Sequence, residues 1–227
     1  MDTTVDWQSI DTVLLDMDGT LLDLHYDSHF WREHLPRHYA AQHGLSLGDA
    51  RAQLLGRYDA VAGTIDWYCL DYWSQALDLD ILALKRSVAH LIALQPRAIE
   101  FLVALHHQGK RRVLVTNAHQ GSLELKLQHT ALGQHLDAII SSHQFRIPKE
   151  QPRFWQQLQQ TTHFNPQRTL LIDDSLPVLR SARHYGIAHL LAASTPDRRQ
   201  ARQHTAEFAP LHDFADILPG ITPGPRT

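Results

Sequence analysis

The sequence has little cysteine and no excess of basic charge. Cys69 is its only cysteine, which excludes an intramolecular disulfide and is typical of a reducing compartment. Lysine and arginine total 21 against 24 aspartates and glutamates and are scattered, a pattern that does not favour a nucleic-acid partner. No apolar run approaches the length of a membrane span, and the N-terminus MDTTVDWQSID has no apolar signal-peptide core. We therefore expect a soluble, cytoplasmic protein that binds neither nucleic acid polymers nor membranes.

Histidine, by contrast, is abundant, with 17 residues. His25 with His29, and His34 with His38, have the i, i+4 spacing of neighbours on a helix. Pro36 interrupts the second pair, however, and the HExxH pattern of many zinc enzymes does not occur. We therefore expect most histidines to be surface or packing residues rather than metal ligands.

One stretch, residues 12–23 with the sequence TVLLDMDGTLLD, carries the strongest signal. Its apolar run predicts a fully buried parallel strand that ends on Asp16, and Asp18, Gly19 and Thr20 follow at once. Two carboxylates at the end of a buried strand are costly unless something neutralises their charge. A turn that merely caps the next helix is the simpler interpretation, and polar groups further along the chain argue against it.

Strand and helix patterns alternate from residue 95 onwards. Apolar runs predict strands at residues 111–118, 137–142, 169–175 and 188–194, with helices at residues 97–108, 122–132, 151–161 and 179–185. Strands that alternate with helices predict an α/β fold with a doubly wound, mostly parallel sheet.

Residues 23–94 lack strand character. Residues 46–63 and 74–94 have helical periodicity, with Ser46 and Ser74 as expected N-caps. The segment also contains an aromatic cluster, made of Tyr26, Phe30, Trp31, Trp67, Tyr68, Tyr72 and Trp73. We expect an all-helical insertion in which most of these aromatics form the core, while one or two line a substrate pocket.

Polar residues follow the predicted strands where those strands end. They are Asp16, Asp18, Thr116, Asn117, Lys149, Asp173 and Asp174. In a doubly wound sheet the ligand binds at the carboxyl ends of the strands, so we expect these side chains to meet in one crevice.

The residue types in this crevice indicate phosphoryl transfer. Carboxylates about 4 Å apart repel each other by about 4 kcal/mol at an effective dielectric near 20, and Mg²⁺ is the dication that best relieves this. Lys149 adds a positive charge, while Thr116 and Asn117 can donate hydrogen bonds to phosphate oxygens. We expect an aspartyl-phosphate route, with Asp16 as nucleophile and Asp18 as general acid and then base.

These motifs resemble those of the haloacid dehalogenase-like hydrolase superfamily. DMDGT at residues 16–20 is similar to its first motif, Thr116-Asn117 to its second, Lys149 to its third and Asp173-Asp174 to its fourth. The resemblance implies that Mg²⁺ is held by the Asp16 carboxylate, the Asp18 main-chain carbonyl, Asp174, and Asp173 directly or through water.

The resemblance also implies a division into domains. The superfamily places a cap domain between its first and second motifs, and such a cap closes over the crevice and excludes water. By this comparison residues 23–94 are the helical cap, and residues 1–22 together with 95–227 are the α/β core.

Longer stretches resemble one branch of the superfamily, the bacterial purine 5′-nucleotidases that act on GMP and IMP. They are DWYCLDYW at residues 66–73, LVTNAH at 114–119, HTALGQHLDAIISSH at 129–143 and TLLIDDS at 169–175. The branch implies a purine nucleoside monophosphate as substrate. The residues we expect to bind it are Thr20, Trp67, Tyr68, Asp71 and Tyr72. Arg146-Ile147 stand where this branch is expected to have Gly-Tyr, which leaves the base preference open.

Other activities use related residues. A haloacid dehalogenase needs neither a metal nor Asp18, and a phosphonate hydrolase needs a cap lysine, for which only the distant Lys85 is present. A sugar-phosphate phosphatase or phosphomutase uses almost the same catalytic set and is the nearest alternative. A non-catalytic binding module is least favoured, because no motif residue is missing. The sequence does not indicate the oligomeric state.

Overall fold

Parallel strands form the centre of the molecule. In the computed structural model, which describes residues 4–218, they build one six-stranded sheet of order β3-β2-β1-β4-β5-β6 with every neighbouring pair parallel. The strands are β1 (Thr12–Leu15), β2 (Arg111–Thr116), β3 (Ala138–Ser141), β4 (Thr169–Asp173), β5 (His189–Ala193) and β6 (Ala209–Leu211). The predicted fold class is confirmed. The sequence analysis missed β6, because a three-residue edge strand that contains a proline has almost no pattern.

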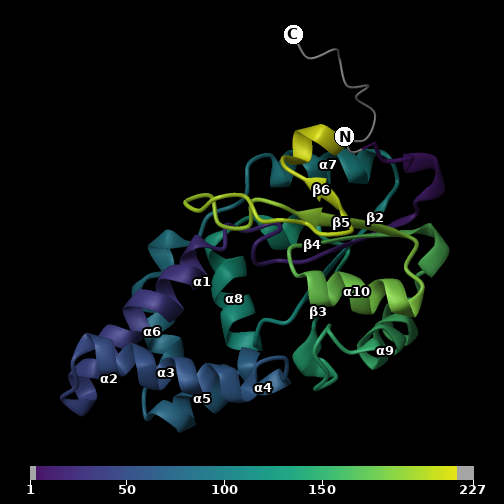
Figure 1. The fold of residues 1–227 in the computed structure, drawn as a ribbon. Coiled ribbons are helices and arrows are strands. Elements are labelled where there is room, and N and C mark those ends of the chain that lie inside the picture. Colours follow the sequence, from purple (N-terminus) through teal and green to yellow (C-terminus); the bar gives the residue numbers. More distant parts are fainter. Residues whose placement is uncertain (1–3, 219–227) are drawn as a thin grey trace.

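Successive residues of β1 point to opposite faces of the sheet, and helices cover both faces. Leu15 lies in the apolar cluster of α7 (Ala98–His107), whereas Leu14 lies in that of α9 (Pro152–Thr162) and α10 (Leu176–Tyr185). Figure 1 shows α7 on one side of the sheet, and α9 and α10 on the other. The strands are therefore apolar on both faces, as a helix-covered parallel sheet requires.

The chain order places a topological switch point beside β1. From β1 the chain runs outwards through β2 to β3, then crosses back to β4 on the other side of β1. The register pairs Leu15 of β1 with Leu114 of β2 and with Ile172 of β4, so these three strands end at nearly the same level. Side chains that follow the three strands are thereby brought together at the carboxyl edge of the sheet.

Helices between β1 and α7 form a second body, here called the helical insertion (residues 23–94). Its elements are α1 (His25–His29), a π-turn (Phe30–His34), α2 (Leu35–His43), α3 (Leu47–Val61), α4 (Ile65–Tyr68), α5 (Leu70–Leu77), α6 (Ile81–Ser87) and a 3-10 turn (Ala89–Leu91). They pack around their own apolar cluster, in which Trp73 is 1% exposed. Figure 1 shows them extending away from the sheet, beside α8 (Gln120–His129).

Two chain crossings join the insertion to the sheet. Leu22 and Leu94 form an isolated antiparallel bridge, and the Asp23 N–H donates to the Ala93 carbonyl at 2.9 Å. The entering and leaving segments therefore run side by side. Both crossings lie beside the DGT turn that follows β1.

One of the two expected helix caps is correct. Ser46 caps α3, since its hydroxyl accepts the Asp49 N–H at 3.1 Å. Ser74 is not an N-cap, because it lies inside α5 and its hydroxyl donates to the Leu70 carbonyl. The helical pattern of residues 74–94 is broken at Asp78, whose φ of 54° ends α5, and Asp80 then caps α6.

Pro36 does not end its helix. The segment runs from α1 into α2 through the π-turn directly before the proline. A π-turn relieves the clash that a proline ring makes with the preceding turn. The His34 and His38 rings consequently stay close, with centroids 4.3 Å apart.

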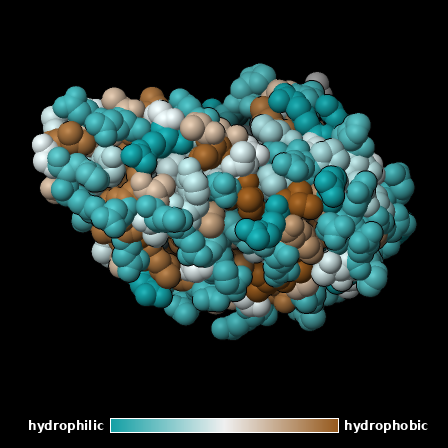
Figure 2. Space-filling view, turned by 90° about the horizontal axis from the view of Figure 1, so that it is seen from below, coloured by the Kyte–Doolittle hydropathy of each residue, from teal (hydrophilic) through white to brown (hydrophobic). Residues whose placement is uncertain are grey.

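Polar side chains cover much of the surface. Figure 2 shows them over most of one face, with apolar groups between them. Within residues 4–218, no helix combines the length and the apolar character needed to cross a bilayer.

Candidate active site

A buried ammonium group lies at the centre of the site. Lys149 Nζ donates to Asp16 Oδ1 at 2.5 Å, to Asp173 Oδ2 at 2.7 Å and to the Val115 carbonyl at 3.0 Å. The lysine is 2% exposed, and the two aspartates are 6% and 1% exposed. Its side chain therefore joins the ends of β1, β2 and β4, as the sequence analysis expected for these motif residues.

A third carboxylate completes an acidic group. Carboxylate oxygens of Asp16, Asp173 and Asp174 all lie within 4.8 Å of one another. Gly19 allows this packing, because a Cβ at that position would lie 2.6 Å from Asp174 Oδ2. The φ of Gly19 is also +87°, a conformation that side chains disfavour. The glycine of the DGT turn is thus required by both space and backbone geometry.

The charges of this group do not balance without a further cation. Burial raises the pKa of Asp16 to about 7, against the opposing attraction of Lys149. Burial, together with the carboxylates of Asp16 and Asp173, also raises the pKa of Asp174 well above its ordinary range. If all three carboxylates are ionised, the one ammonium leaves two negative charges, and the raised pKa values reflect the cost of that state. A dication that prefers oxygen ligands, such as Mg²⁺, fits both this donor set and this charge.

Asp18 belongs to a second chain of charges, which runs into the helical insertion. Lys126 Nζ lies 2.7 Å from both Asp18 Oδ1 and Asp27 Oδ2, and Lys85 Nζ lies 2.8 Å from Asp27 Oδ1. Burial raises the pKa of Asp18 to about 6, although the Lys126 ammonium opposes the shift. A carboxyl that titrates near neutral pH suits general acid and base catalysis.

Asp27 is held ionised in spite of its burial. Burial alone raises its pKa, but the ammonium groups of Lys126 and Lys85 outweigh that effect and lower the pKa to about 2. The sequence analysis did not assign Asp27 or Lys126 to the site. Lys126 sits at a core-facing position of α8, where a charged residue is a weak signal that it has a buried partner.

Thr116 and Asn117 support the loop that carries Lys149. Asn117 Oδ1 accepts the Lys149 N–H at 3.0 Å, and its amide donates to Glu150 Oε2 at 3.0 Å. Glu150 Oε1 in turn accepts the Tyr68 hydroxyl at 2.5 Å, which links the insertion to the sheet. Thr116 Oγ1 accepts the Ala118 N–H at 3.0 Å, which leaves the hydroxyl hydrogen free to donate. Glu150 carries no motif signal, and the sequence analysis missed it.

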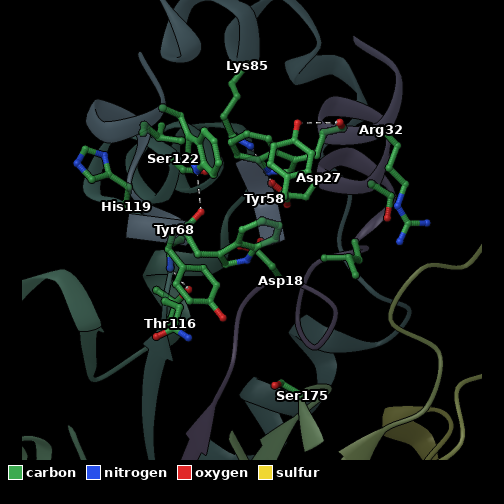
Figure 3. Close-up of a pocket in the computed structure, with 18 of the residues that line it drawn as sticks. Asp18, Asp27, Arg32, Tyr58, Tyr68, Lys85, Thr116, His119, Ser122 and Ser175 are labelled. Carbon is green, nitrogen blue, oxygen red and sulfur yellow. Dashed lines mark hydrogen bonds and ion pairs between the residues drawn. The ribbon is translucent and has the colours of Figure 1, made fainter. Parts of the chain in front are cut away.

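One cavity connects these groups to the insertion. Its volume is about 910 Å³, and its lining includes all seven predicted motif residues from Asp16 to Asp174. On the insertion side, charged and aliphatic residues share the lining with five aromatic ones, here called the aromatic wall: Trp31, Tyr58, Trp67, Tyr68 and Trp73. Figure 3 shows Thr116 and Ser175 on the sheet side, with Arg32, Tyr58 and Lys85 across the cavity from them.

The residues expected to bind substrate lie in different places. Trp67 and Tyr68 line the cavity, whereas Asp71 and Tyr72 are outside its lining. The Asp71 side chain is 85% exposed and lies 3.5 Å from His119 Nε2. Thr20 is also outside the lining and is 1% exposed, and its Oγ1 has no hydrogen-bond partner among the described residues.

Arg146-Ile147 stand in place of the expected Gly-Tyr, and this difference affects the structure of the loop before Lys149. Arg146 adopts a φ of 55°, a conformation that glycine adopts with less strain. Ile147 packs against the apolar cluster of α9 and α10 and is not part of the cavity lining. An isoleucine at this position therefore fills the core rather than the substrate space.

The fold and the charge cluster at the carboxyl edge define a class of hydrolase. The family model of haloacid dehalogenase-like hydrolases matches residues 10–186, so the chain belongs to that family. The predicted family is confirmed, and the protein is a hydrolase of this class.

Known proteins of similar sequence are nucleotidases. The GMP/IMP nucleotidase YrfG of Escherichia coli (strain K12) and that of Shigella flexneri are each 41% identical to this chain over 221 residues. The alignments cover 97% of this chain and 100% of each relative.

Solved structures share the fold. A HAD phosphatase from Thermococcus onnurineus has a TM-score of 0.76 and 21% identity, over 91% of this chain and 95% of that one. CbbY from Rhodobacter sphaeroides, in complex with phosphate, has a TM-score of 0.63 and 18% identity with the same coverage.

Removing the charge of Asp27 tests the second charge chain. Asp27→Asn leaves the buried Lys85 ammonium without a carboxylate and Lys126 with Asp18 alone, and we expect the free energy of unfolding at pH 7 to fall by about 3–5 kcal/mol. Because folding lowers the pKa of Asp27, its contribution is present above the unfolded pKa and is lost as pH falls from about 4 towards 2. The difference between wild type and variant, measured by denaturant unfolding, should therefore shrink over that range. Exposed Asp66→Asn is the control, and a difference that is independent of pH contradicts the interpretation.

A double-mutant cycle tests the contacts of Lys149 with Asp16 and Asp173. In the presence of chelator, Lys149→Met should lower the free energy of unfolding by about 3–5 kcal/mol, because it leaves Asp16 and Asp173 buried without their cation. Asp173→Asn should then cost less in the Lys149→Met protein than in wild type, since it removes one uncompensated charge. Additive effects would show that the ammonium does not hold these carboxylates.

Proposed function

We propose that this chain is a Mg²⁺-dependent phosphatase of nucleoside monophosphates, with IMP and GMP as preferred substrates, that acts through a phosphoryl group on Asp16. The observation that carries the proposal is the single cavity of about 910 Å³ that connects Asp16 to an aromatic wall. Such a volume is ample for a nucleotide and far exceeds the need of a phosphate group alone.

Asp16 is the nucleophile in this proposal. Its carboxylate attacks phosphorus, the ester oxygen leaves, and water then hydrolyses the aspartyl phosphate to release inorganic phosphate. The Lys149 ammonium favours the ionised form of Asp16 against the effect of burial and reduces the repulsion between the carboxylate and the phosphate dianion. Asn117 acts indirectly, since it fixes the backbone on which Lys149 is carried.

Asp18 acts as the general acid and then as the general base in this proposal. In its neutral form it protonates the leaving oxygen, and as a carboxylate it then accepts a proton from the attacking water. Lys126 positions Asp18 and stabilises the ionised form in which it serves as a base. Mg²⁺ would be held by Asp16, Asp173 and Asp174, together with the Asp18 main-chain carbonyl, and supplies positive charge that draws the phosphoryl oxygens into place.

The aromatic wall offers a binding site for the base. Trp31, Tyr58 and Trp67 have adjacent rings, with 5.9 Å and 5.5 Å between the Tyr58 centroid and the two tryptophans. Exposed charged residues of both signs line the same cavity, among them Arg32 and Asp59. Arginine donors suit the O6 and N7 acceptors of a 6-oxopurine, and a carboxylate suits its N1–H. The two relatives named as GMP/IMP nucleotidases support the same choice of base.

The helical insertion acts as the cap in this proposal, with residues 1–22 and 95–227 as the core domain. Contacts between the two parts include Tyr68 with Glu150 and Asp27 with Lys126. Closure over the crevice excludes water from the acyl phosphate until the nucleoside has left.

A phosphate-release screen tests the proposal. Purified protein is assayed with nucleoside monophosphates and sugar phosphates, in Mg²⁺ and in chelator. We expect the highest kcat/KM with IMP and GMP and no turnover in chelator, because the carboxylate cluster then repels the phosphate. Asp16→Asn should lower kcat by more than about 1,000-fold, since the nucleophile is lost.

Each outcome of the screen is informative. Steady activity of Asp16→Asn would reject the covalent route. Sugar phosphates that rank with or above IMP would reject the nucleotidase assignment and leave a broader phosphatase. Conversion of a hexose 1-phosphate without phosphate release would instead indicate a phosphomutase.

Trp67 provides a test of base stacking. Trp67→Ala should lower kcat/KM for IMP by about 5- to 150-fold, the equivalent of about 1–3 kcal/mol of stacking on one ring. Trp67→Phe keeps a ring face and should lose much less. Hydrolysis of glycerol 2-phosphate, which has no base, should change little in either variant. Equal losses with both substrates would show that Trp67 serves the fold of the insertion rather than the base.

A further inference from the structure

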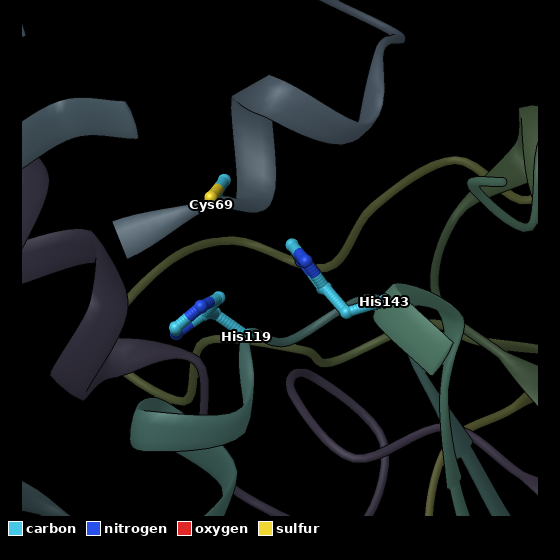
Figure 4. A group of neighbouring side chains, drawn as sticks. All are labelled: Cys69, His119 and His143. Carbon is cyan, nitrogen blue, oxygen red and sulfur yellow. The ribbon is translucent and has the colours of Figure 1, made fainter. Parts of the chain in front are cut away.

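Three potential metal ligands meet outside the acidic group. Cys69, His119 and His143 each offer a ligand atom, and these atoms all lie within 4.8 Å of one another. Figure 4 shows that they come from separate segments, with Cys69 above and the two histidines below it. Cys69 precedes α5 in the helical insertion, His119 follows β2, and His143 lies in the 3-10 turn after β3 (Ser142–Gln144). The sequence analysis expected most histidines to be surface or packing residues and did not connect these three.

The His143 ring has a nitrogen that no side chain or backbone group within residues 4–218 satisfies. Its Nε2 atom is buried and has no hydrogen-bond partner among the described residues. The Asn117 backbone lies near the ring and opposes the lowering of its pKa. A buried polar atom without a partner calls for an explanation, and a bound metal ion would provide the missing partner. Burial, with the neighbouring His119, lowers the pKa of His143 to about 4, so its ring is neutral at pH 7.

The other two side chains are placed to complete a site. Cys69 is the N-cap of α5, and its sulfur accepts the Tyr72 N–H at 3.5 Å. A helix N-terminus favours the negative charge that a metal-bound thiolate carries. The His119 and His143 rings meet edge to face with centroids 5.0 Å apart. Asp71, whose carboxylate is exposed, lies 3.5 Å from His119 Nε2.

We propose that Cys69, His119 and His143 bind a Zn²⁺ ion, or another late first-row dication, that is distinct from the catalytic Mg²⁺. One thiolate and two imidazoles form a soft to borderline ligand set that suits zinc and discriminates against magnesium. Tetrahedral zinc places such ligand atoms about 3.4–3.6 Å apart, so side-chain rotations must close any wider gap between them. At His119 the metal replaces the contact either with Asp71 or with the Gly121 N–H.

Such a metal joins the insertion to the sheet. One ligand belongs to the insertion and two to loops at the carboxyl edge, and His119 is two residues from Asn117. Bound zinc therefore holds the insertion closed over the cavity. The expected consequence for turnover, which rests on the proposed function, is inhibition that excess Mg²⁺ does not reverse, because substrate exchange requires the cap to open.

The single cysteine makes a direct spectroscopic test possible. Co²⁺ is added to the full chain under reducing conditions in the presence of excess Mg²⁺, which occupies the acidic group. A thiolate–cobalt charge-transfer band in the near ultraviolet can arise only from Cys69. We expect the band to saturate at one equivalent of Co²⁺ and to be abolished by one equivalent of Zn²⁺, which binds more tightly.

Matched variants distinguish a metal site formed by all three side chains from metal binding by the Cys69 thiol alone. Cys69→Ser keeps an N-cap for α5 and should abolish the band without unfolding the protein, as circular dichroism checks. His143→Gln should weaken Zn²⁺ binding at least about tenfold, whereas the exposed His107→Gln on α7 should leave it unchanged. No band in the wild-type protein, or a band that survives in His143→Gln at the same Co²⁺ concentration, would overturn the proposal. Because these readouts do not use activity, their failure is distinguishable from failure of the proposed function.

Discussion

The ammonium group of Lys149 is the interaction on which the site depends. The register of β1, β2 and β4 brings several carboxylates to one edge of a buried sheet, where each is costly in isolation. Lys149 reaches into this edge and contacts Asp16 and Asp173 together. One ammonium does not balance three ionised carboxylates, and the residual negative charge favours a dication at this edge. The parallel sheet thus brings carboxylates together at one edge, and the proposed catalytic chemistry uses the negative charge that Lys149 leaves unbalanced.

A second chain of buried charges links this edge to the helical insertion. Asp18 contacts Lys126, Lys126 contacts Asp27, and Asp27 contacts Lys85. Because the two lysines are buried and the two aspartates are only partly exposed, each group depends on its neighbour for charge balance. The insertion is therefore coupled electrostatically to the carboxyl that would transfer protons, as well as joined to the sheet by two chain crossings. Lys126 therefore takes part in both the proposed closure, through Asp27, and the proposed proton transfer, through Asp18.

Local sequence patterns predicted the sheet and the meeting of its motif residues, whereas the charged contacts between the helical insertion, α8 and the Lys149 loop were not predicted. The strand that ends on Asp16 and the alternation of strands and helices specify the fold, because burial on both faces leaves a continuous apolar run. The positions of Asn117 and Lys149 result from that topology. Lys126, Asp27 and Glu150 were missed, since nothing in their local sequence distinguishes a buried, paired charge from a solvated one. Ser74 was misread as a cap because helical periodicity alone does not show where α5 ends at Asp78.

A crystal grown with Mn²⁺ in place of Mg²⁺ tests the central claim most directly, because anomalous scattering locates the metal without assumptions about the reaction. The account predicts a metal peak in contact with the carboxylates of Asp16 and Asp174, with Lys149 Nζ still hydrogen-bonded to Asp16 and Asp173. A metal bound only elsewhere, or a Lys149 side chain turned out to solvent, would contradict it.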